Sequence, residues 1–519
     1  MLVIGLNVAA FGVRLWFVVV SGPLAATTGY EEFCLYNIWK VLHALPLYES
    51  PIHEPYLLTS YNGGFYYVYA AWARLWQADG PSLVLCARLF SVVWALAGWA
   101  LSVRVLRRLA PDVPGARLWF WGLPFLVWFG TSFNAWGPVS SRPDLTAAAF
   151  AVAGLLLCLH AEERRAGWIW PVASLGFFAA WGCKQSVVWI FAGVALHLLL
   201  SRRWRDLVGL ALPFAGLAAI ALLGSSEEYR FNLFTVPKIY RWMPGQIVGL
   251  LSQAVILNLF FWLLGAMAVR RVFARDDAGP GAGARRMVAI AAIPALLVGA
   301  VQLTLHGSST NNILEGFLLV SLLGAALWLR RRDEPSGRLA PLGAALLALM
   351  VPLPAVQLAL AAKGVPFAHV HGVSLGNLIK LNAAQREVRG RYAEFVERLP
   401  QPFWARDAMY QLPWYANDNR YPAFPVDAQF LADALARQVL GRSSIAVLVR
   451  QRYFASLLLR PNDMLVRVAR RFGYVEQPLP DDLGILPSEY GVNYPRPVLL
   501  VRAPLSGGAG SGSAAPAGN

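Results

Sequence analysis

The feature that most constrains this chain is a series of long apolar stretches, each close to the length needed to cross a bilayer. A spanning α-helix needs roughly 20 apolar residues. Of the 519 residues, 57% are hydrophobic and only 14% are charged, which is few for a soluble protein. The pattern predicts a polytopic α-helical membrane protein with about eleven transmembrane helices, near residues 2–22, 83–103, 118–136, 144–160, 167–182, 185–201, 207–224, 246–269, 287–305, 312–329 and 339–361.

Charges between the predicted spans give these helices an orientation. Starting with residues 104–117, every second inter-span segment is rich in arginine, whereas the other segments hold few basic residues. Cytoplasmic loops carry the excess of lysine and arginine in membrane proteins. We therefore expect a multi-pass protein of a bacterial inner membrane, with a cytoplasmic N-terminus and the C-terminus outside. The net charge of +16 then reflects membrane orientation, and no nucleic-acid partner is expected.

The sequence divides into three parts. Residues 1–361 form the predicted transmembrane domain, and its long first outer loop covers residues 23–82. Residues 362–504 mix helical and β-branched patterns, which predicts a small extracytoplasmic α/β domain. The last part, 505–519, is rich in Gly, Ser and Ala and is expected to be disordered.

Shorter patterns predict secondary structure outside the spans. In the first outer loop, Tyr30–Leu45 and Gly64–Trp76 are expected to be helices that lie along the membrane surface, because they carry aromatic side chains: Trp39, Tyr66, Tyr67, Trp72 and Trp76. The C-terminal domain is expected to contain two helices and two strands, which are Asn377–Leu399, Asp427–Leu440, Ser444–Val449 and Pro497–Val501.

Several classes of function lack their motifs. The sequence contains no P-loop, no glycine-rich dinucleotide motif, no HExxH and no GxSxG context. ATP-driven transport and soluble-nucleotide chemistry therefore have no support. The four cysteines have no CxxC spacing or zinc pattern; Cys86 and Cys158 fall within spans, and the other two are Cys34 and Cys183.

Candidate chemistry gathers on the predicted outer face. Ionisable groups are costly in lipid and mark functional sites by default, and those at outer span ends are Glu31, Glu32, His53, Glu54, Arg142, Asp144, Lys184, Glu227, Glu228, Arg230, His306 and Glu315. Glu31 and Glu32 directly follow the first span. A carboxylate there is a candidate general base that takes a proton from an attacking hydroxyl. The alternative is a solvated helix N-terminus, where acids are favoured by the helix dipole.

Two further outer segments carry charge. Pro143 at the start of the fourth predicted span is ordinary helix-start chemistry, but Asp144 heads an apolar run, and the alternative is a pair with Arg142 that faces a cavity. Lys184 lies in a break between two short spans, and such breaks occur where the backbone is buried or lines a wet cavity. It is either a partner for a lipid phosphate or a lysine reaching the headgroups. The aromatic and basic segment 225–244 is expected to anchor at the interface.

Three segments of the chain together resemble a known family. The stretch GYEEFCLYNIWKVLHALPLYESPIHEPYLLTSYNGGFYYVYAAWARL, followed by SRPDLTAAAF and GCKQSVVWIF, resembles the GT-C superfamily of membrane glycosyltransferases over roughly residues 1–330. Within it, the chain looks like the dolichyl-phosphate-mannose-protein mannosyltransferases and aminoarabinose transferases. The resemblance implies an inverting glycosyltransferase, a hexosyl- or pentosyltransferase. It would move a sugar from a polyprenyl-phosphate carrier to a lipid, glycan or protein acceptor at the outer face.

The resemblance also implies roles for particular residues. The general base falls to Glu31 or Glu32, and Asp144 would orient the acceptor or bind a divalent cation, the one cofactor that is implied. Arg142 and Lys184 match positions near the carrier phosphate, and the matching stretch adds His53, Glu54 and Tyr61 as candidates for binding substrate.

Two features depart from the family pattern. The family acid is more often Asp, and Asn62-Gly63-Gly64 stands where a proline is usual. The first leaves open which glutamate is the base, because neighbours on a helix point about 100° apart. The second leaves the shape of the acceptor groove open.

Two other classes of function compete with the transferase. A transporter or flippase for a lipid-linked glycan would show inverted repeats and ionisable residues near the midplane. Arg14 and Arg88 inside spans favour it, but no convincing repeat is evident. A non-catalytic envelope assembly protein would use the outer domain as a binding module, and its outer acids would share no common cavity.

Overall fold

The computed structural model describes most of the helical region and part of the C-terminal region. The described residues are 1–21, 31–49, 59, 61–113, 117–130, 137–236, 242–256, 258–274, 279–305, 310–331, 339–352, 354–355, 358, 390–392, 394–396, 398–400, 402–405, 437, 441, 443–483 and 496–503. The tail 505–519, most of the two helices expected between residues 377 and 440, and the candidates His53 and Glu54 lie outside them.

Helices make up nearly all of the structure described before residue 350. They are α1 Leu2–Ser21, α2 Glu31–Leu42, α3 Gly63–Leu75, α4 Pro81–Leu109, α5 Arg117–Phe125, α6 Pro143–Arg164, α7 Ile169–Cys183, α8 Trp189–Leu200, α9 Trp204–Leu223, α10 Glu227–Arg230, α12 Gln246–Ile256, α13 Leu259–Phe273, α14 Ala282–Gln302, α15 Leu314–Arg331 and α16 Leu339–Ala348. Short π or 3-10 turns connect some of them: η2 Leu126–Gly130, η3 Gly137–Val139, η4 Phe231–Thr235 and η5 Thr310–Ile313.

Five of the described helices are long and apolar enough to cross a membrane, which supports a membrane location. They are α4, α6, α9, α14 and the helix formed by η5 and α15. A sixth span results if α12 and α13, which are bent by 92° at their junction, count as one. The other predicted spans correspond to shorter apolar helices, so the count of eleven stays a prediction. The expected break near Lys184 is confirmed, because α7 ends at Cys183 and α8 begins at Trp189.

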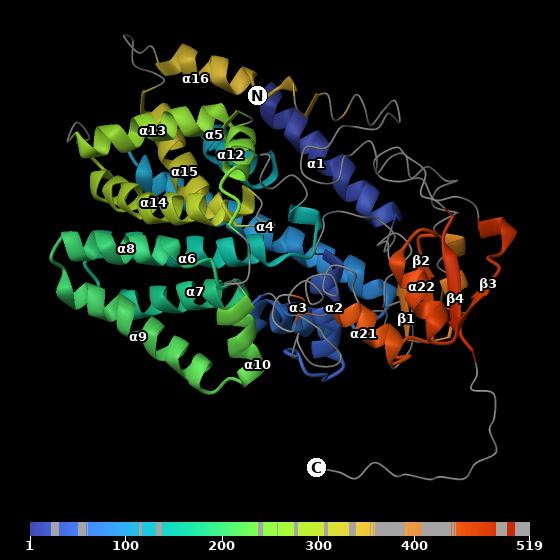
Figure 1. The fold of residues 1–519 in the computed structure, drawn as a ribbon. Helices are drawn as coiled ribbons and strands as arrows, with labels where there is room; N and C mark the ends of the chain where they lie inside the picture. The colour runs from blue at the N-terminus through green and yellow to red at the C-terminus, as the bar shows by residue number, and fades with distance from the viewer. Residues whose placement is uncertain are drawn as a thin grey trace.

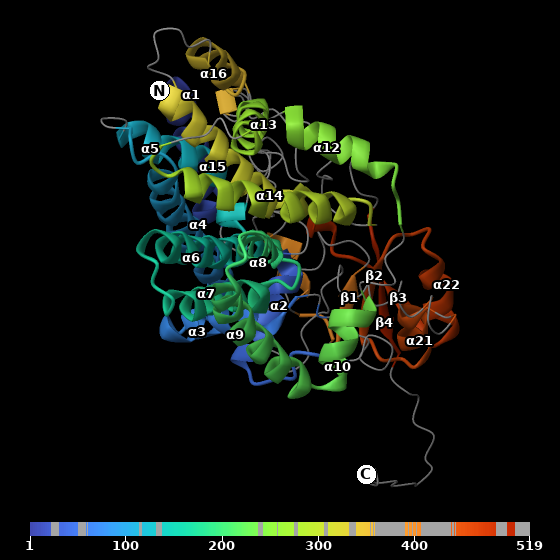
Figure 2. The ribbon, with the colours of Figure 1, turned by 90° about the vertical axis from the view of Figure 1, so that its left-hand side faces the viewer.

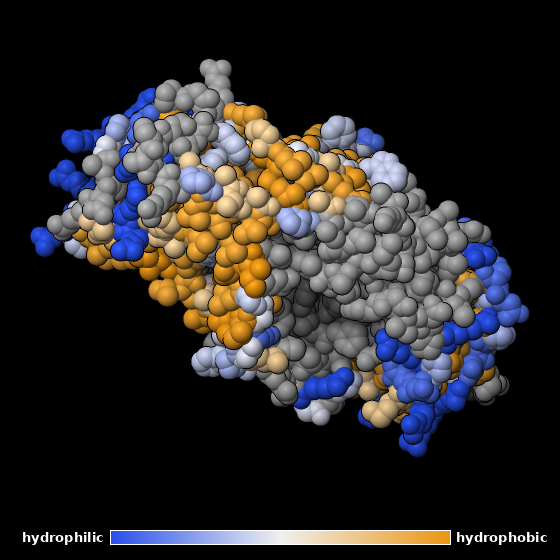
Figure 3. All heavy atoms as spheres, turned by 90° about the horizontal axis from the view of Figure 1, so that it is seen from above, coloured by the Kyte–Doolittle hydropathy of each residue, from blue (hydrophilic) through white to orange (hydrophobic). Residues whose placement is uncertain are grey.

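The helices pack into a bundle around α15. α15 contacts α13 and α14, α14 contacts α8, and α6 contacts α4 and α7 (Figures 1 and 2). In the apolar window of the η5–α15 span, 94% of residues are buried, whereas in α9 only 6% are. On the face in Figure 3, apolar side chains cover much of the bundle, and hydrophilic ones gather at the left end of the molecule and over the C-terminal region at its right end. This distribution is that of a protein whose sides meet lipid.

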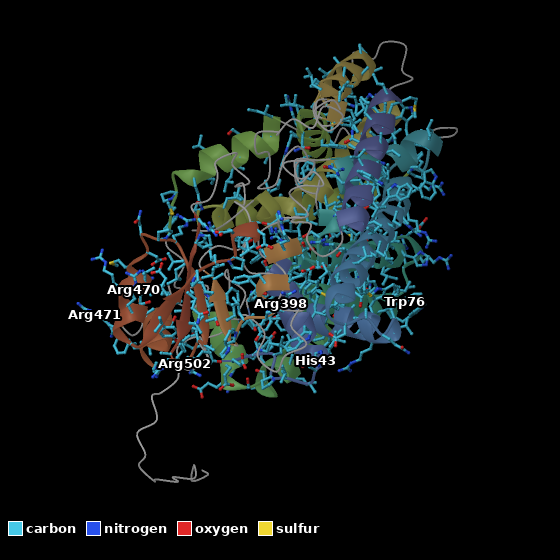
Figure 4. The ribbon with its side chains drawn as sticks, turned by 90° about the vertical axis from the view of Figure 1, so that its right-hand side faces the viewer. His43, Trp76, Arg398, Arg470, Arg471 and Arg502 are labelled. Carbon is cyan, nitrogen blue, oxygen red and sulfur yellow. The ribbon has the colours of Figure 1, made fainter. Side chains whose placement is uncertain are left out.

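The two helices of the first outer loop pack against the bundle. α2 contacts α3, and α3 contacts α4 and α7. Tyr67 and Trp76 are 58% and 63% exposed, and Figure 4 shows Trp76 at the edge of the molecule. Trp39 and Tyr66, in contrast, are buried in the core. The expected helices are therefore confirmed, but their aromatic side chains divide between a buried and an exposed face.

Side-chain hydrogen bonds fix the first outer loop against the bundle. Asn62 donates to the carbonyl of Trp181 in α7 at 2.6 Å, and the Tyr229 hydroxyl donates to the Asn62 side-chain carbonyl at 3.1 Å. The side-chain carbonyl of Asn232 accepts from the Thr59 backbone N–H at 3.1 Å. The segment after α9, expected only to anchor at the interface, thus also joins the loop to the end of α7.

The C-terminal region contains a four-stranded sheet with the order β1-β2-β4-β3. Its strands are β1 Phe403–Ala405, β2 Ser456–Leu459, β3 Tyr474–Gln477 and β4 Val498–Arg502. β1 and β2 are parallel, and the other two pairs are antiparallel. In Figure 1 the sheet lies at the end of the bundle near α2 and α3, away from the α8–α9 turn. The strand expected at Pro497–Val501 is confirmed as β4.

The strand expected at Ser444–Val449 is wrong, because this segment is the helix α21, Ser444–Arg450. Its buried residues are Ser444, Ile445, Leu448 and Val449, which follow a helical repeat and not an alternation. The Ser443 hydroxyl also accepts from the Ala446 backbone N–H and caps the helix. A second amphipathic helix, α22 Met464–Arg471, follows β2; Figure 4 shows Arg470 and Arg471 on the far side of this domain.

Candidate functional site

The first acid of the site is Glu31, which begins α2. Arg88 of α4 holds its carboxylate with two bonds, from Nε to Oε1 at 2.9 Å and from Nη2 to Oε2 at 2.7 Å. Both side chains are 3% exposed. A bidentate, buried pair of this kind is geometrically specific.

Glu31 is joined to the second acid through the loop before α6. The backbone N–H of Ser141 donates to Glu31 Oε1 at 2.9 Å. Arg142 then occupies the N-cap position of α6, with Pro143 at its first turn. Asp144 follows in the first helical turn, where a negative charge is favoured by the helix dipole. The backbone that binds Glu31 and the second carboxylate therefore belong to one short stretch of chain.

Asp144 is surrounded by donors from three segments of chain. Lys184 Nζ donates to Oδ1 at 2.6 Å, and Asn311 Nδ2 donates to the same oxygen at 2.7 Å. Arg142 Nε lies 3.3 Å from Oδ2. The break between α7 and α8 brings Lys184 to this point, since Lys184 is the extended residue that ends α7. Both carboxylate oxygens of Asp144 therefore face positive or amide groups.

All four charged groups of the site interact with one thiol, that of Cys34. Burial raises the pKa of the Cys34 thiol of α2, and that thiol also interacts with the charges of Glu31, Arg142, Asp144 and Lys184. Hence the two acids and the two cations all lie within electrostatic reach of the Cys34 thiol.

Arg142 is held as a cation by its surroundings. Burial disfavours the charged guanidinium, but Asp144 and Tyr61 outweigh this and raise the Arg142 pKa. The Tyr61 side chain also forms a hydrogen bond with Arg142. Tyr61 therefore belongs to the same cluster, as expected for a candidate in the first outer loop.

Besides Arg142 Nε, the buried polar atoms that have no hydrogen-bond partner in the described part of the chain include the Ser141 hydroxyl oxygen and the indole nitrogen of Trp189. Buried polar atoms are nearly always hydrogen-bonded, and an exception needs an explanation such as a ligand. Both residues adjoin groups of the cluster, since the Ser141 backbone binds Glu31 and Trp189 begins the helix after Lys184.

The structure therefore brings together Glu31, Tyr61, Arg142, Asp144 and Lys184. Glu32 lies in α2, next to Glu31, and its side chain is outside the described part of the structure, as are His53 and Glu54.

The residues around Asp144 do not fit a divalent cation. Its oxygens face the cations of Lys184 and Arg142, which would repel such an ion. Within the described residues no three His, Cys, Asp or Glu side chains gather to hold a metal.

Three residues that bind the site or lie next to it had no role assigned from the sequence: Arg88, Asn311 and Glu315. Arg88 favoured a transporter, yet it is the partner of Glu31. A buried arginine inside a predicted span needs a hydrogen-bonding partner, and this need was the available signal. Arg14, the other such residue, donates to the Phe129 carbonyl at 2.9 Å. Glu315 was predicted only as an ionisable residue at an outer span end, and Asn311 had no assigned role.

Comparisons with known proteins give similarity only at the level of the fold. No family model matches the chain, and no curated protein matches it. A crystal structure of ArnT from Cupriavidus metallidurans bound to undecaprenyl phosphate is similar with a TM-score of 0.57 and 14% identity, over 96% of this chain and 99% of that chain. The apo state of the same protein gives 0.56 and 15% over the same shares. The comparisons therefore support a GT-C-like fold for this chain.

Proposed function

We propose that the chain is an inverting glycosyltransferase that moves a sugar from a polyprenyl-phosphate carrier to a lipid, glycan or protein acceptor. The observation that carries the proposal is the buried cluster in which Lys184 and Arg142 meet Asp144 while Ser141 joins that group to Glu31. Cations beside carboxylates, with unused polar atoms next to them, suit a substrate that is itself an anion with hydroxyl groups. The GT-C-like fold supports the same class, and the structurally similar ArnT was crystallised with undecaprenyl phosphate.

The chemistry is a single displacement. The acceptor hydroxyl oxygen attacks the anomeric carbon, the bond from that carbon to the carrier phosphate breaks, and the hydroxyl proton passes to a carboxylate. The polyprenyl phosphate leaves with the bonding electron pair. Lys184 and Arg142 stabilise the charge that develops on the phosphate, so neither a nucleotide nor a metal is required by this scheme.

The two adjacent glutamates take different roles in the proposal. Both oxygens of Glu31 accept from Arg88, and one also accepts from Ser141. A general base must reach the acceptor hydroxyl by a hydrogen bond, and both Glu31 oxygens are already occupied by these donors. We assign Glu31 to positioning the α2 start and Glu32 to the general base. Asp144 orients the acceptor or the cations around it.

The proposal also includes the location of the reaction. Residues 1–361 would form the transmembrane domain of a bacterial inner-membrane protein, with the N-terminus in the cytoplasm. Residues 362–504 would form the extracytoplasmic domain, next to the site. The arginine-rich segments between spans support this orientation.

The orientation is tested with a cysteine reagent that cannot cross membranes. Because such a reagent does not reach buried sites, it is applied to two exposed positions, in the variants Gln77→Cys and Arg104→Cys. Only Gln77→Cys should react from outside intact cells, and the reverse result would contradict the orientation.

The decisive experiment uses the purified full chain in lipid nanodiscs. Donors are undecaprenyl phosphate carrying a radiolabelled hexose or pentose, and acceptors are the lipid, glycan and protein fractions of a cell-envelope extract. We expect label to move to one fraction, with Glu32→Gln losing transfer by about a hundredfold or more, the usual scale for a general base. Arg104→Gln, an exposed residue at the far end of α4, is the control. No transfer from either donor, together with no binding of undecaprenyl phosphate, would refute the proposal.

A further inference from the structure

Glu315 is a buried acid that the transfer scheme does not use. It lies in the first turn of α15 and is 6% exposed. Its carboxylate accepts from the backbone N–H of Ile190 at 3.1 Å and from that of Trp189 at 3.4 Å. These groups belong to the first turn of α8, where backbone N–H groups have no partner within the helix. Glu315 thus caps the N-terminus of a helix other than its own.

The helix that Glu315 caps has no cap of its own. The N-cap residue of α8 is Val188, and it forms no side-chain capping bond. An N-cap is ordinarily Ser, Thr, Asp or Asn from the same segment. The start of α8 therefore depends on a carboxylate supplied by α15.

The same turn of chain that carries Glu315 also binds the reaction centre. Asn311, four residues before Glu315, donates to Asp144 Oδ1 at 2.7 Å, and Lys184 donates to the same oxygen at 2.6 Å. Lys184 in turn lies four residues before Val188. These contacts form a closed circuit. Asn311 at the start of α15 binds Asp144, Asp144 binds Lys184, the break leads from Lys184 to α8, and the start of α8 binds Glu315.

The helix α14 packs closely against the start of α15. A Cβ at Gly299 of α14 would lie 2.8 Å from the carbonyl oxygen of Asn312, so the two backbones are already in contact. On the other side of the circuit, a Cβ at Gly193 of α8 would lie 2.3 Å from the Cα of Ala291. α14 therefore supports both the capping turn and the helix that it caps.

We propose that Glu315 is a positioning residue for the transfer: by capping α8, it sets the break between α7 and α8 so that Lys184 reaches Asp144. The role of this geometry in catalysis rests on the proposed function, whereas the capping itself does not. A cation displaced by about 1 Å from a developing charge is enough to lower a rate about a hundredfold.

The first test measures the geometry without any substrate. Hydrogen–deuterium exchange of the peptide covering residues 186–192 is compared in wild type, Glu315→Ala and Glu315→Gln. We expect about tenfold faster exchange in Glu315→Ala, the change that the loss of a typical helix cap produces, and a smaller change in Glu315→Gln, whose amide oxygen still accepts. Ser321→Ala, a buried change further along α15, is the control and leaves this peptide unchanged.

The second test is a rescue combined with kinetics. In Glu315→Ala, kcat for the labelled undecaprenyl-phosphate donor is expected to fall about a hundredfold, with KM changed much less. Adding Val188→Ser restores a local cap and is expected to recover the slow exchange and, on the order of magnitude of one cap, about a tenth or more of the wild-type kcat. Simple loss of stability would not be repaired by this one hydroxyl.

The outcomes separate the two proposals. Unchanged exchange in Glu315→Ala, or no recovery of exchange with Val188→Ser, overturns the positioning role. If Glu315→Ala does not fold, Glu315→Gln decides, because exchange and kcat identical to wild type would then overturn the proposal. Wild-type protein that transfers no sugar but shows the expected exchange pattern refutes the transferase alone and leaves the cap in place.

Discussion

The Glu31–Arg88 pair allows a quantitative prediction about stability. Removing one partner of a buried ion pair leaves an uncompensated charge and costs about 3–5 kcal/mol. Glu31→Gln and Arg88→Met are each expected to lower the free energy of unfolding by about that much, because both side chains are 3% exposed and share two short bonds. In the double variant neither charge of the pair remains. Its loss should therefore fall short of the sum by about 2–3 kcal/mol, the upper part of the range for residues in contact.

The assay is reversible unfolding by SDS in mixed micelles, followed by circular dichroism, for the wild type, both single variants and the double variant. Exposed residues Glu394 and Arg398 provide a matched control, since their ion pair is 3.8 Å long and their side chains are 71% and 80% exposed. The cycle of Glu394→Gln and Arg398→Met is expected to give a coupling of no more than about 1 kcal/mol. If the losses at Glu31 and Arg88 simply add, with a coupling no larger than that of the control cycle, the two groups do not interact in the folded protein.

Three further predictions concern other parts of the structure. A Cβ at Gly64 would lie 2.6 Å from the Gly182 carbonyl oxygen. Gly64→Ala is therefore expected to cost about 1–3 kcal/mol of folding stability and to lower the melting temperature. The control is Gly182→Ala, where a Cβ meets nothing within 4 Å and the melting temperature should not fall. Lys184→Met should lower both stability and transfer because Asp144 loses its closest cation, and adding Asp144→Asn should recover the melting temperature but not transfer. Ser443→Ala removes the cap of α21 and should cost about 1 kcal/mol without altering binding of undecaprenyl phosphate.

The parts of the fold that depend on hydropathy were predictable from the sequence. Long apolar runs predicted α4, α6, α9, α14 and α15, and the polar interruption at Lys184 predicted the break between α7 and α8. The failure at Ser444–Val449 has a local cause. A short run of β-branched and aliphatic residues suits a strand or a short buried helix equally, and the capping hydroxyl of Ser443 favours the helix.

The site was predictable only in part, for a different reason. Charged residues at outer span ends indicated Glu31, Arg142, Asp144 and Lys184, because each is expensive in lipid. Their partners were not predictable, since Arg88 and Asn311 lie 57 and 167 residues away in sequence from Glu31 and Asp144. Hydropathy indicates how deep a residue lies in the membrane but not which neighbouring helix it faces. That second property comes from packing between helices such as α14 and α15.

The contrast between α15 and α9 has an evolutionary consequence. Nearly every side chain along α15 meets other side chains, so a substitution there must match volume as well as polarity. Along α9 the expected neighbours are lipid tails, which accept any apolar side chain. Most positions on α9 are therefore expected to tolerate exchange among apolar residues, whereas α15 and the buried ion pairs are expected to tolerate few substitutions. A bundle built this way keeps its architecture long after its overall sequence identity has decayed.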